Sequence, residues 1–403
     1  MNKLQYFLWK IKDVKPEDYL AVFPMVTGEI VSLFYKKKYK DYWIICEDPK
    51  EARDNGYWLF KYIREQHPEQ KIIYLINKDS VDYYKVAKLG QCVQYGSLKH
   101  WILYFTTRFN ISSQKGGKPN AALCAFFELN GKFKPHNIFL QHGVIKDDLV
   151  WLHADRSCIE TFITSAVPEY EFVRDVYGYK PGVVQRTGLP RFDNLHDNKI
   201  IKNQILIMPS WRAWFTEASS RADESDANFA NSEYLIRWKE ILNSDELKKL
   251  IDKYHLKVVF YPHRNMQHFL SFFHDVKAYI TIASYRDYDV QNLLKESEMM
   301  ITDYSSVFFD MIYMKKPVLF YQFDEEKFRK QQYEKGYFDY HNNSFGKSFN
   351  DYKSVVMELE NIIKDDYKVD EAFLKAHDEY FPYFDTNNSE RIYRLLKGKE
   401  SRD

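Results

Sequence analysis

Several apolar runs of this sequence end in histidine, arginine, serine or aspartate, which are residue types that bind anions and move protons. His142 follows the apolar run 138–140 after one intervening residue, and Gly143 comes next. A histidine with a pKa near neutrality can accept a proton from a hydroxyl group, and the glycine lets another group approach the backbone closely. His142 is therefore a candidate general base, although a lone histidine is more often structural.

A second polar set follows the apolar run 299–301, where Thr302, Asp303, Ser305 and Ser306 precede a helical pattern of apolar residues. Asp303, Ser305 and Ser306 are favourable N-cap residues. A helix N-terminus also has free backbone N–H groups and a partial positive charge, which suit a phosphate. This stretch is compatible with helix capping alone and with ligand binding.

Arg212 and the pair His263-Arg264 also lie just beyond apolar runs, at 205–208 and 257–261. The carboxyl ends of parallel strands meet at one edge of a sheet, where open α/β sheets bind their ligands. Fixed cations at that edge stabilise a diphosphate and the negative charge of a transition state. Together with the serines, they predict a site for an anionic ligand in the second half of the chain.

Alternating strand and helix patterns in both halves predict an α/β protein with two doubly wound, Rossmann-like domains. We expect an N-terminal domain over residues 1–195, a C-terminal domain over 204–385, and a C-terminal helix and tail over 386–403. Within the second domain, residues 217–231 are expected to form a loop and 234–254 a single helix. Ligands of such a domain pair are expected in the central cleft that the two domains face.

Composition narrows the classes of function. The formal net charge of +1 gives no general attraction to nucleic acid. The chain has no GxGxxG, GxxxxGK[ST], HExxH or GxSxG motif, and its four cysteines show no zinc spacing. We therefore expect no metal, no cofactor and no nucleic-acid partner.

The N-terminal segment is basic and aromatic, with Tyr35 and Tyr39 among the lysines at 36, 37, 38 and 40. An anionic membrane surface would attract this segment, whereas a solvated basic face is the plainer interpretation. The chain shows no signal-peptide pattern and no apolar run of about 18 residues, so we expect a cytoplasmic protein. A peripheral location on the inner face of the plasma membrane is also a candidate. Further lysines precede this segment at Lys3, Lys10, Lys12 and Lys15.

The block 302–306, with Phe309-Asp310 and the run 316–321, resembles the CDP-glycerol glycerophosphotransferase family, the teichoic-acid primases and polymerases. Other blocks resemble motifs of that family in the same order, over most of residues 41–345. These blocks are Asp54-Asn55, Gln141-His142-Gly143, Thr187-Gly188 through Asp193, Pro209-Ser210-Trp211-Arg212, Pro262-His263, and Lys335-Gly336 through Tyr340.

The resemblance implies a GT-B fold with the nucleotide donor in the C-terminal domain. It implies transfer of glycerol phosphate or ribitol phosphate from CDP-glycerol or CDP-ribitol to a hydroxyl of a cell-wall or capsule polymer, or of its glycolipid precursor, releasing CMP. His142 takes the position of the proposed general base, and His263, Ser305 and Ser306 take donor-phosphate positions. By the same comparison the donor site includes Ser210, Arg212, Arg264, Thr302 and Asp303, and the acceptor side includes Gly143, Lys146 and Arg191.

Some residues depart from the family pattern. Lys146 lies four residues after His142, whereas in many family members the lysine lies five residues after the histidine. Lys335 stands where the family has arginine, and Arg264 stands where proline is common. The chain also lacks the long helical extension of large polymerases, which favours a compact enzyme. A GT-B glycosyltransferase that uses a nucleotide sugar stays open as an alternative, as does a catalytically silent scaffold of the same fold.

Overall fold

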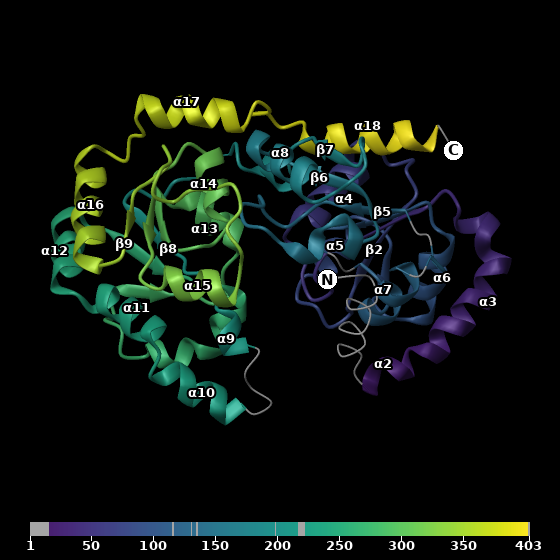
Figure 1. The fold of residues 1–403 in the computed structure, drawn as a ribbon, viewed down its shortest axis with the longest axis horizontal. Coiled ribbons are helices and arrows are strands. Elements are labelled where there is room, and N and C mark those ends of the chain that lie inside the picture. The colour runs from purple at the N-terminus through teal and green to yellow at the C-terminus, as the bar shows by residue number, and fades with distance from the viewer. Residues whose placement is uncertain are drawn as a thin grey trace. The chain divides into compact units, whose positions relative to one another are not determined.

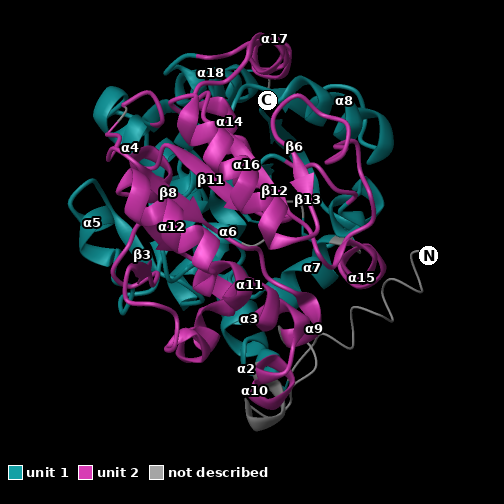
Figure 2. Ribbon diagram, turned by 90° about the vertical axis from the view of Figure 1, so that its left-hand side faces the viewer, with its two compact units in different colours: residues 1–144, 149–194, 385–403 teal, residues 145–148, 195–384 magenta. Residues whose placement is uncertain are grey.

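The computed structural model describes residues 16–114, 117–129, 131–133, 136–197, 199–216 and 222–401. The chain divides into two units, each with its own sheet (Figure 2). Unit 1 comprises Met1–Val144, Leu149–Asn194 and Asp385–Asp403, and unit 2 comprises Ile145–Asp148 and Leu195–Phe384. The main boundary between the units lies between Asn194 and Leu195, next to the boundary expected at residue 195. The C-terminal segment, expected to be separate, belongs to unit 1, and 145–148 belongs to unit 2.

Unit 1 contains a seven-stranded sheet in the order β3-β2-β1-β4-β5-β6-β7, with every pairing parallel. Strands β1, β2 and β4 are buried throughout, because helices cover both faces of such a sheet. The strand order reverses between β1 and β4, which makes this the topological switch point of a Rossmann-like sheet. The strands are β1 Trp43–Cys46, β2 Ile72–Ile76, β3 Cys92–Gln94, β4 Phe109–Ser112, β5 Asn137–Phe139, β6 Ile159–Thr164 and β7 Val184–Arg186.

The helices of unit 1 include a long N-terminal helix, α3, that packs along α6 (Figure 1). Gly28 makes the close packing possible, since a Cβ there would lie 2.6 Å from Cβ of Trp101. None of the described helices has both the length and the apolarity needed to cross a membrane. The helices are α2 Pro16–Leu20, α3 Val22–Tyr39, α4 Asn55–Gln66, α5 Tyr83–Ala87, α6 Leu98–Thr106, α7 Ala121–Leu129, α8 Val167–Val176 and α18 Asn388–Glu400, with 3₁₀ turns η1 Val150–Leu152, η2 Ala154–Arg156 and η3 Pro190–Asn194.

Unit 2 contains a six-stranded parallel sheet in the order β10-β9-β8-β11-β12-β13. Its order reverses between β8 and β11, so a second switch point lies there. The predicted α/β fold with two Rossmann-like domains of the GT-B class is confirmed. The strands are β8 Gln204–Ile207, β9 Lys257–Phe260, β10 Ile280–Ile282, β11 Met299–Thr302, β12 Val318–Tyr321 and β13 Ser348–Phe349.

The helices of unit 2 differ from expectation at two places. Residues 217–231, expected to form a loop, contain helix α10. The single helix expected over 234–254 is broken at Ser244. The Ser244 side chain accepts a hydrogen bond from Leu247 N–H at 3.2 Å and so begins α12 as its N-cap. The helices are α9 Ala213–Thr216, α10 Ala222–Ala230, α11 Glu233–Asn243, α12 Asp245–Tyr254, α13 Val290–Glu296, α14 Phe308–Tyr313, α15 Glu325–Gln331, α16 Tyr352–Lys364 and α17 Glu371–Tyr380, with η4 Arg264–Phe273.

Helix α18 joins unit 1 through its first turn. Asp193 accepts hydrogen bonds from the backbone N–H groups of Asn388 at 2.8 Å and Ser389 at 2.9 Å, which satisfies donors that a helix start leaves free. Gly188 lies directly beneath this turn with a φ of +85°, and a Cβ there would lie 1.7 Å from Oδ1 of Asn388. The block 187–193 therefore fastens the C-terminal helix to unit 1.

The substitution Gly188→Ala tests this attachment. It combines an unfavourable positive φ with a steric clash, so we expect the free energy of unfolding to fall by roughly 2 to 4 kcal/mol, measured by denaturant titration. Gly178→Ala is the matched control, because Gly178 has a φ of +72° and nothing within 4 Å of the added Cβ. The control should cost about 1 to 2 kcal/mol, and equal losses in the two variants would contradict the attachment.

Candidate active site

The turn that carries His142 lies after β5 of unit 1, and the His142 side chain is exposed. Gln141 before it has a φ of +62°, which costs a non-glycine residue about 1 to 2 kcal/mol. Side-chain contacts hold Gln141 in this conformation. The Asn55 amide donates to the Gln141 carbonyl at 2.8 Å, and the Gln141 amide donates to Oε1 of Glu169 at 3.1 Å. The backbone before His142 is thus fixed while its ring meets solvent.

Arg191 fixes the same turn from the other side. Its Nη1 donates to the carbonyl oxygen of His142 and to Oδ1 of Asp54, the latter at 3.0 Å. Its backbone N–H donates to Oδ1 of Asn55 at 3.0 Å. Three sequence blocks, 54–55, 141–143 and 187–193, therefore converge on one turn. The Arg191 guanidinium, expected on the acceptor side, is buried and holds the His142 backbone.

In unit 2, hydrogen bonds tie together the loops that follow β8, β9 and β11. The N–H of Ser210, after β8, donates to Oδ1 of Asp303, after β11, at 2.8 Å. The N–H of His263, after β9, donates to the carbonyl of Pro209 at 2.9 Å. These three strands are neighbours at the topological switch point, so the predicted strand-end residues of unit 2 come together at one edge.

Arg212 lies beneath these loops with none of its side chain exposed. Its Nη2 lies 2.8 Å from Oδ2 of Asp303, its Nε donates to Oδ2 of Asp324 at 2.8 Å, and its Nη1 donates to Oγ of Ser210 at 2.9 Å. Burial alone would lower the pKa of Arg212, but the carboxylates of Asp303 and Asp324 raise it above its ordinary value. The guanidinium is permanently charged and fully engaged within the protein.

Three of the expected donor-site residues are engaged within the protein. Arg212, Thr302 and Asp303 are all completely buried, and the Thr302 hydroxyl donates to the Met208 carbonyl at 2.7 Å. The cluster of one guanidinium and two carboxylates is also net negative, so it offers no spare positive charge to a diphosphate. Here these residues support the loops from below.

The serines of the 302–306 block lie nearer the surface. Helix α14 begins at Phe308, with Val307 as its N-cap and no side-chain cap. Of the two interpretations of this stretch, helix capping is not observed, because Asp303 is engaged by Arg212 and the serines precede the N-cap. Ser305 Oγ accepts a weak bond from Val307 N–H at 3.5 Å, and Ser306 is half-buried. The two hydroxyls lie in a turn at the carboxyl end of β11.

His263 and Arg264 lie at the start of η4 and are half-buried. Nδ1 of His263 accepts a hydrogen bond from Asn265 N–H at 3.1 Å. In the neutral ring the proton must then be on Nε2, which makes Nε2 a hydrogen-bond donor. The Arg264 guanidinium lies 5.2 Å from the centre of the Tyr285 ring. Both residues can present positive or hydrogen-bonding groups to an anion.

The remaining acceptor-side residues fall in different units. Gly143 is buried in the His142 turn of unit 1. Lys146, expected in the N-terminal domain, belongs to unit 2, where its ammonium pairs with Asp147. Burial lowers the pKa of Lys146, with the Asp147 charge opposing this shift. Lys146 is thus a buried residue paired with Asp147 within unit 2.

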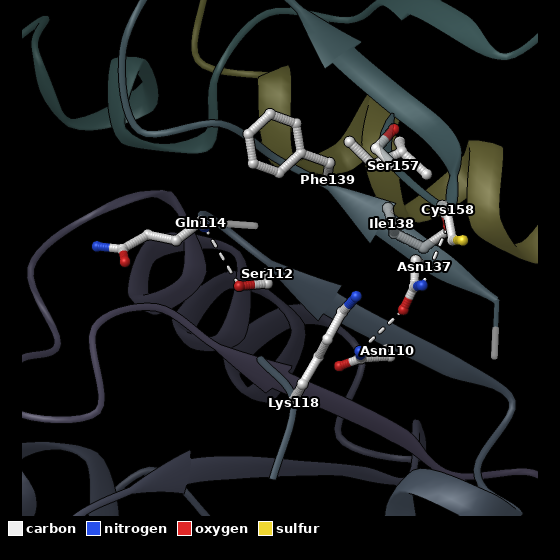
Figure 3. Close-up of a pocket in the computed structure, with 10 residues that line it drawn as sticks. Asn110, Ser112, Gln114, Lys118, Asn137, Ile138, Phe139, Ser157 and Cys158 are labelled. Carbon is white, nitrogen blue, oxygen red and sulfur yellow. Dashed lines mark hydrogen bonds between the residues drawn. The ribbon is translucent and has the colours of Figure 1, made fainter. Parts of the chain in front are cut away.

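Two cavities bear on where a ligand could bind. One in unit 1, between β4, β5 and the start of β6, has a volume of about 20 Å³, and Lys118 points towards Asn110 and Asn137 there (Figure 3). This is room for about one water molecule, so the cavity does not suit a nucleotide. The other, in unit 2, has a volume of about 360 Å³ and is bordered by Trp214 and Asp324.

Asp324 is the site residue that the sequence interpretation missed. It follows β12 by three residues, so the strand-end argument that selected Arg212 and His263 applies to it equally. Asp324 also borders the larger cavity, where Lys327 lies with its ammonium 4.6 Å from the centre of the Trp214 ring. Among the described residues, no group of three or more His, Cys, Asp or Glu side chains could hold a metal ion.

A family model and the similar proteins compared with this chain point to the same family. A family model described as CDP-glycerol:poly(glycerophosphate) glycerophosphotransferase matches residues 29–398. The minor teichoic acid biosynthesis protein GgaB of Bacillus subtilis (strain 168) is 33% identical over 390 residues, covering 93% of this chain and 41% of that protein. The teichoic acid ribitol-phosphate polymerase TarL of Staphylococcus aureus (strain NCTC 8325 / PS 47) is 25% identical over 262 residues, covering 60% and 42%.

The chain spans less than half the length of these two relatives. Among solved structures, that of the wall teichoic acid polymerase TagF superposes with a TM-score of 0.67 at 16% sequence identity. The superposition covers 100% of this chain and 98% of that one. At this identity the likeness establishes the shared fold.

The substitution Arg212→Met tests the buried cluster. It leaves the Asp303 and Asp324 carboxylates buried without their cation, so the free energy of unfolding should fall by roughly 3 to 5 kcal/mol. Arg237→Met is the control, since Arg237 pairs with Glu233 and Glu240 at the surface of the same unit. The control should cost less than about 1 kcal/mol in the same denaturant titration. A similar loss in both variants would show that Arg212 is not the buried partner of these carboxylates.

Proposed function

Since the chain belongs to the CDP-glycerol:poly(glycerophosphate) glycerophosphotransferase family, as its motifs predicted, we propose that it is a phosphotransferase acting on a CDP-alditol. It transfers glycerol phosphate or ribitol phosphate to a hydroxyl of a cell-wall or capsule polymer, or of its lipid-linked precursor, and releases CMP. The observation that carries this proposal is the family match over 29–398, which includes His142 as well as the strand-end residues of unit 2. Ribitol is retained as an alternative because TarL is a ribitol-phosphate polymerase.

The donor binds to unit 2 in this proposal. Its diphosphate accepts hydrogen bonds from Ser305, Ser306 and Nε2–H of His263, with Arg264 supplying positive charge. Arg212 and the residues it holds keep these loops in place without touching the donor. Phosphoryl transfer depends mainly on positioning and on stabilisation of charge, and these groups provide both.

The acceptor hydroxyl is activated by His142. The imidazole takes the hydroxyl proton as the oxygen attacks the phosphorus that bears the alditol. The new oxygen–phosphorus bond forms while the bond between that phosphorus and the bridging oxygen breaks, and CMP leaves with the bridging oxygen. The exposed ring and the fixed backbone of His142 support this role, because a general base must be accessible and well oriented.

A nucleotide-release assay tests the proposed reaction. The protein is incubated with a glycerol-phosphate-primed lipid acceptor and, in separate reactions, CDP-glycerol, CDP-ribitol or a UDP-sugar. We expect acceptor-dependent CMP release from at least one CDP-alditol. Release from the UDP-sugar alone would instead identify a glycosyltransferase, and release from none of the three would support a silent scaffold.

The variants His142→Ala and His263→Ala separate the two halves of the mechanism. His142→Ala should lower turnover by at least about 100-fold, since general-base catalysis is worth that much or more, while calorimetry shows unchanged binding of the CDP-alditol. His263→Ala should weaken donor binding as well. His136→Ala is a surface control in unit 1, where His136 contacts Glu160. Near-normal turnover in His142→Ala would refute the base assignment.

The same proposal includes a cytoplasmic enzyme whose α2–α3 segment rests on an anionic membrane surface. Leu20, Phe23, Leu33 and Phe34 are each at least 74% exposed, whereas Met25 on the other side of α3 is buried. An apolar helix face of this kind suits the interface of a bilayer, and the lysines of 36–38 in the last turn suit anionic headgroups. The four lysines before residue 16 lie outside the described residues.

Vesicle co-sedimentation tests the membrane contact. The double variant Phe23→Ser/Phe34→Ser should bind vesicles of phosphatidylglycerol and phosphatidylcholine at least about tenfold more weakly, because each lost phenylalanine removes a large apolar area. The matched control is Val81→Ser/Tyr84→Ser, which changes two other exposed apolar residues of unit 1. The control should bind as the unaltered protein does, and equal weakening of both variants would count against α3 as the contact.

A further inference from the structure

The chain makes a short excursion directly after the His142 turn. Residues up to Val144 belong to unit 1, Ile145–Asp148 belong to unit 2, and the chain returns to unit 1 at Leu149. On its return, the Leu149 N–H donates to the Tyr177 hydroxyl at 3.0 Å. Four residues are thus built into unit 2 although both of their neighbours along the chain belong to unit 1.

Polar contacts hold this four-residue segment in unit 2. The Asp148 N–H donates to the Glu334 carbonyl at 3.1 Å in an isolated antiparallel bridge. Asp147 is buried and accepts a hydrogen bond from Nη1 of Arg329 at 2.6 Å. The Lys146 ammonium pairs with Asp147 as well. Charged groups buried in this way are costly to separate, so the segment is firmly held.

Gly336 makes the closest contact with the segment. A Cβ at Gly336 would lie 2.2 Å from the carbonyl oxygen of Lys146 and 2.8 Å from Cα of Asp147. Both are backbone atoms, so they cannot yield as the end of a flexible side chain could. The glycine of the block 335–340 is therefore required because residues 146–147 press directly against it.

We propose that Arg329 and Gly336 are positioning residues for His142, acting through the segment 145–148. The inference rests on the proposed function, in which His142 is the general base. The contacts of Gln141 hold the backbone before His142, Arg191 holds the His142 carbonyl, and the segment holds the backbone three residues further on. Ile145 lies only three residues after His142, so firm attachment of the segment restricts the conformations open to the His142 turn, and a displacement of about 1 Å can lower a rate about 100-fold.

The variant Gly336→Ala tests this role, with Gly346→Ala as its matched control. A Cβ at Gly346 would lie 2.1 Å from the Val318 carbonyl oxygen, so the control introduces a similar clash in unit 2 away from the segment. Gly336→Ala should lower kcat by about tenfold or more with unchanged affinity for CDP-glycerol or CDP-ribitol. It should also speed amide hydrogen exchange over residues 142–148, and Gly346→Ala should do neither.

A second pair of variants tests the same role without adding a steric clash, so it still applies if the glycine variants misfold. Arg329→Met removes the ion pair with Asp147, whereas Lys330→Met, one residue along α15, removes only a surface pair with Glu326. We expect Arg329→Met alone to lower kcat and to speed exchange over 142–148. Unchanged kcat and exchange in Arg329→Met would overturn the proposal.

Combination with His142→Ala distinguishes positioning from a general structural effect. If Gly336 acts through His142, then Gly336→Ala should change the residual turnover of His142→Ala by no more than about twofold, because residues that act as a unit are not additive. A full additional loss would overturn the positioning role while leaving the proposed function intact. Normal turnover in His142→Ala itself would instead remove the proposed function and this inference with it.

Discussion

The ion cluster of Arg212 with Asp303 and Asp324 is the interaction on which the candidate donor site depends. One buried guanidinium joins loops that follow β8, β11 and β12, and the Asp303 carboxylate also accepts the Ser210 N–H. A buried charge without its partner is strongly destabilising, so these loops cannot separate without a large cost in free energy. The conformation of the turn that carries Ser305 and Ser306 thus follows from these ion pairs and not from capping of α14.

Much of this architecture could be predicted from the sequence because buried parallel strands appear as continuous apolar runs. The runs at 72–76 and 205–207 are strands, and the polar residues that follow several strands do gather at sheet edges. Less could be predicted where a contact joins distant segments. The burial of Lys146 depends on its place in unit 2, and the attachment of α18 depends on Asp193, so neither is visible in local pattern. Helix α10 was missed because its residues are small and polar.

The candidate site residues of the two units are held in the same way. In unit 1, Arg191 and Asn55 fix a backbone turn and leave the His142 ring exposed. In unit 2, Arg212 and Asp303 fix the loops and leave two serines and His263 nearer the surface. Several motif residues are therefore scaffolding, and a sequence motif alone does not say which of its members meet a ligand. Burial and hydrogen-bond partners make that distinction.

The route of the chain has a consequence for biosynthesis. Domains generally fold as units during translation, the N-terminal one first. Here unit 2 is complete once Phe384 has left the ribosome, whereas unit 1 still lacks α18. Until that helix is made, Gly188 has no cover, and Trp43 at the start of β1 lacks its contacts with Tyr393 and Glu400. The unit that begins the polypeptide is therefore the last to be finished.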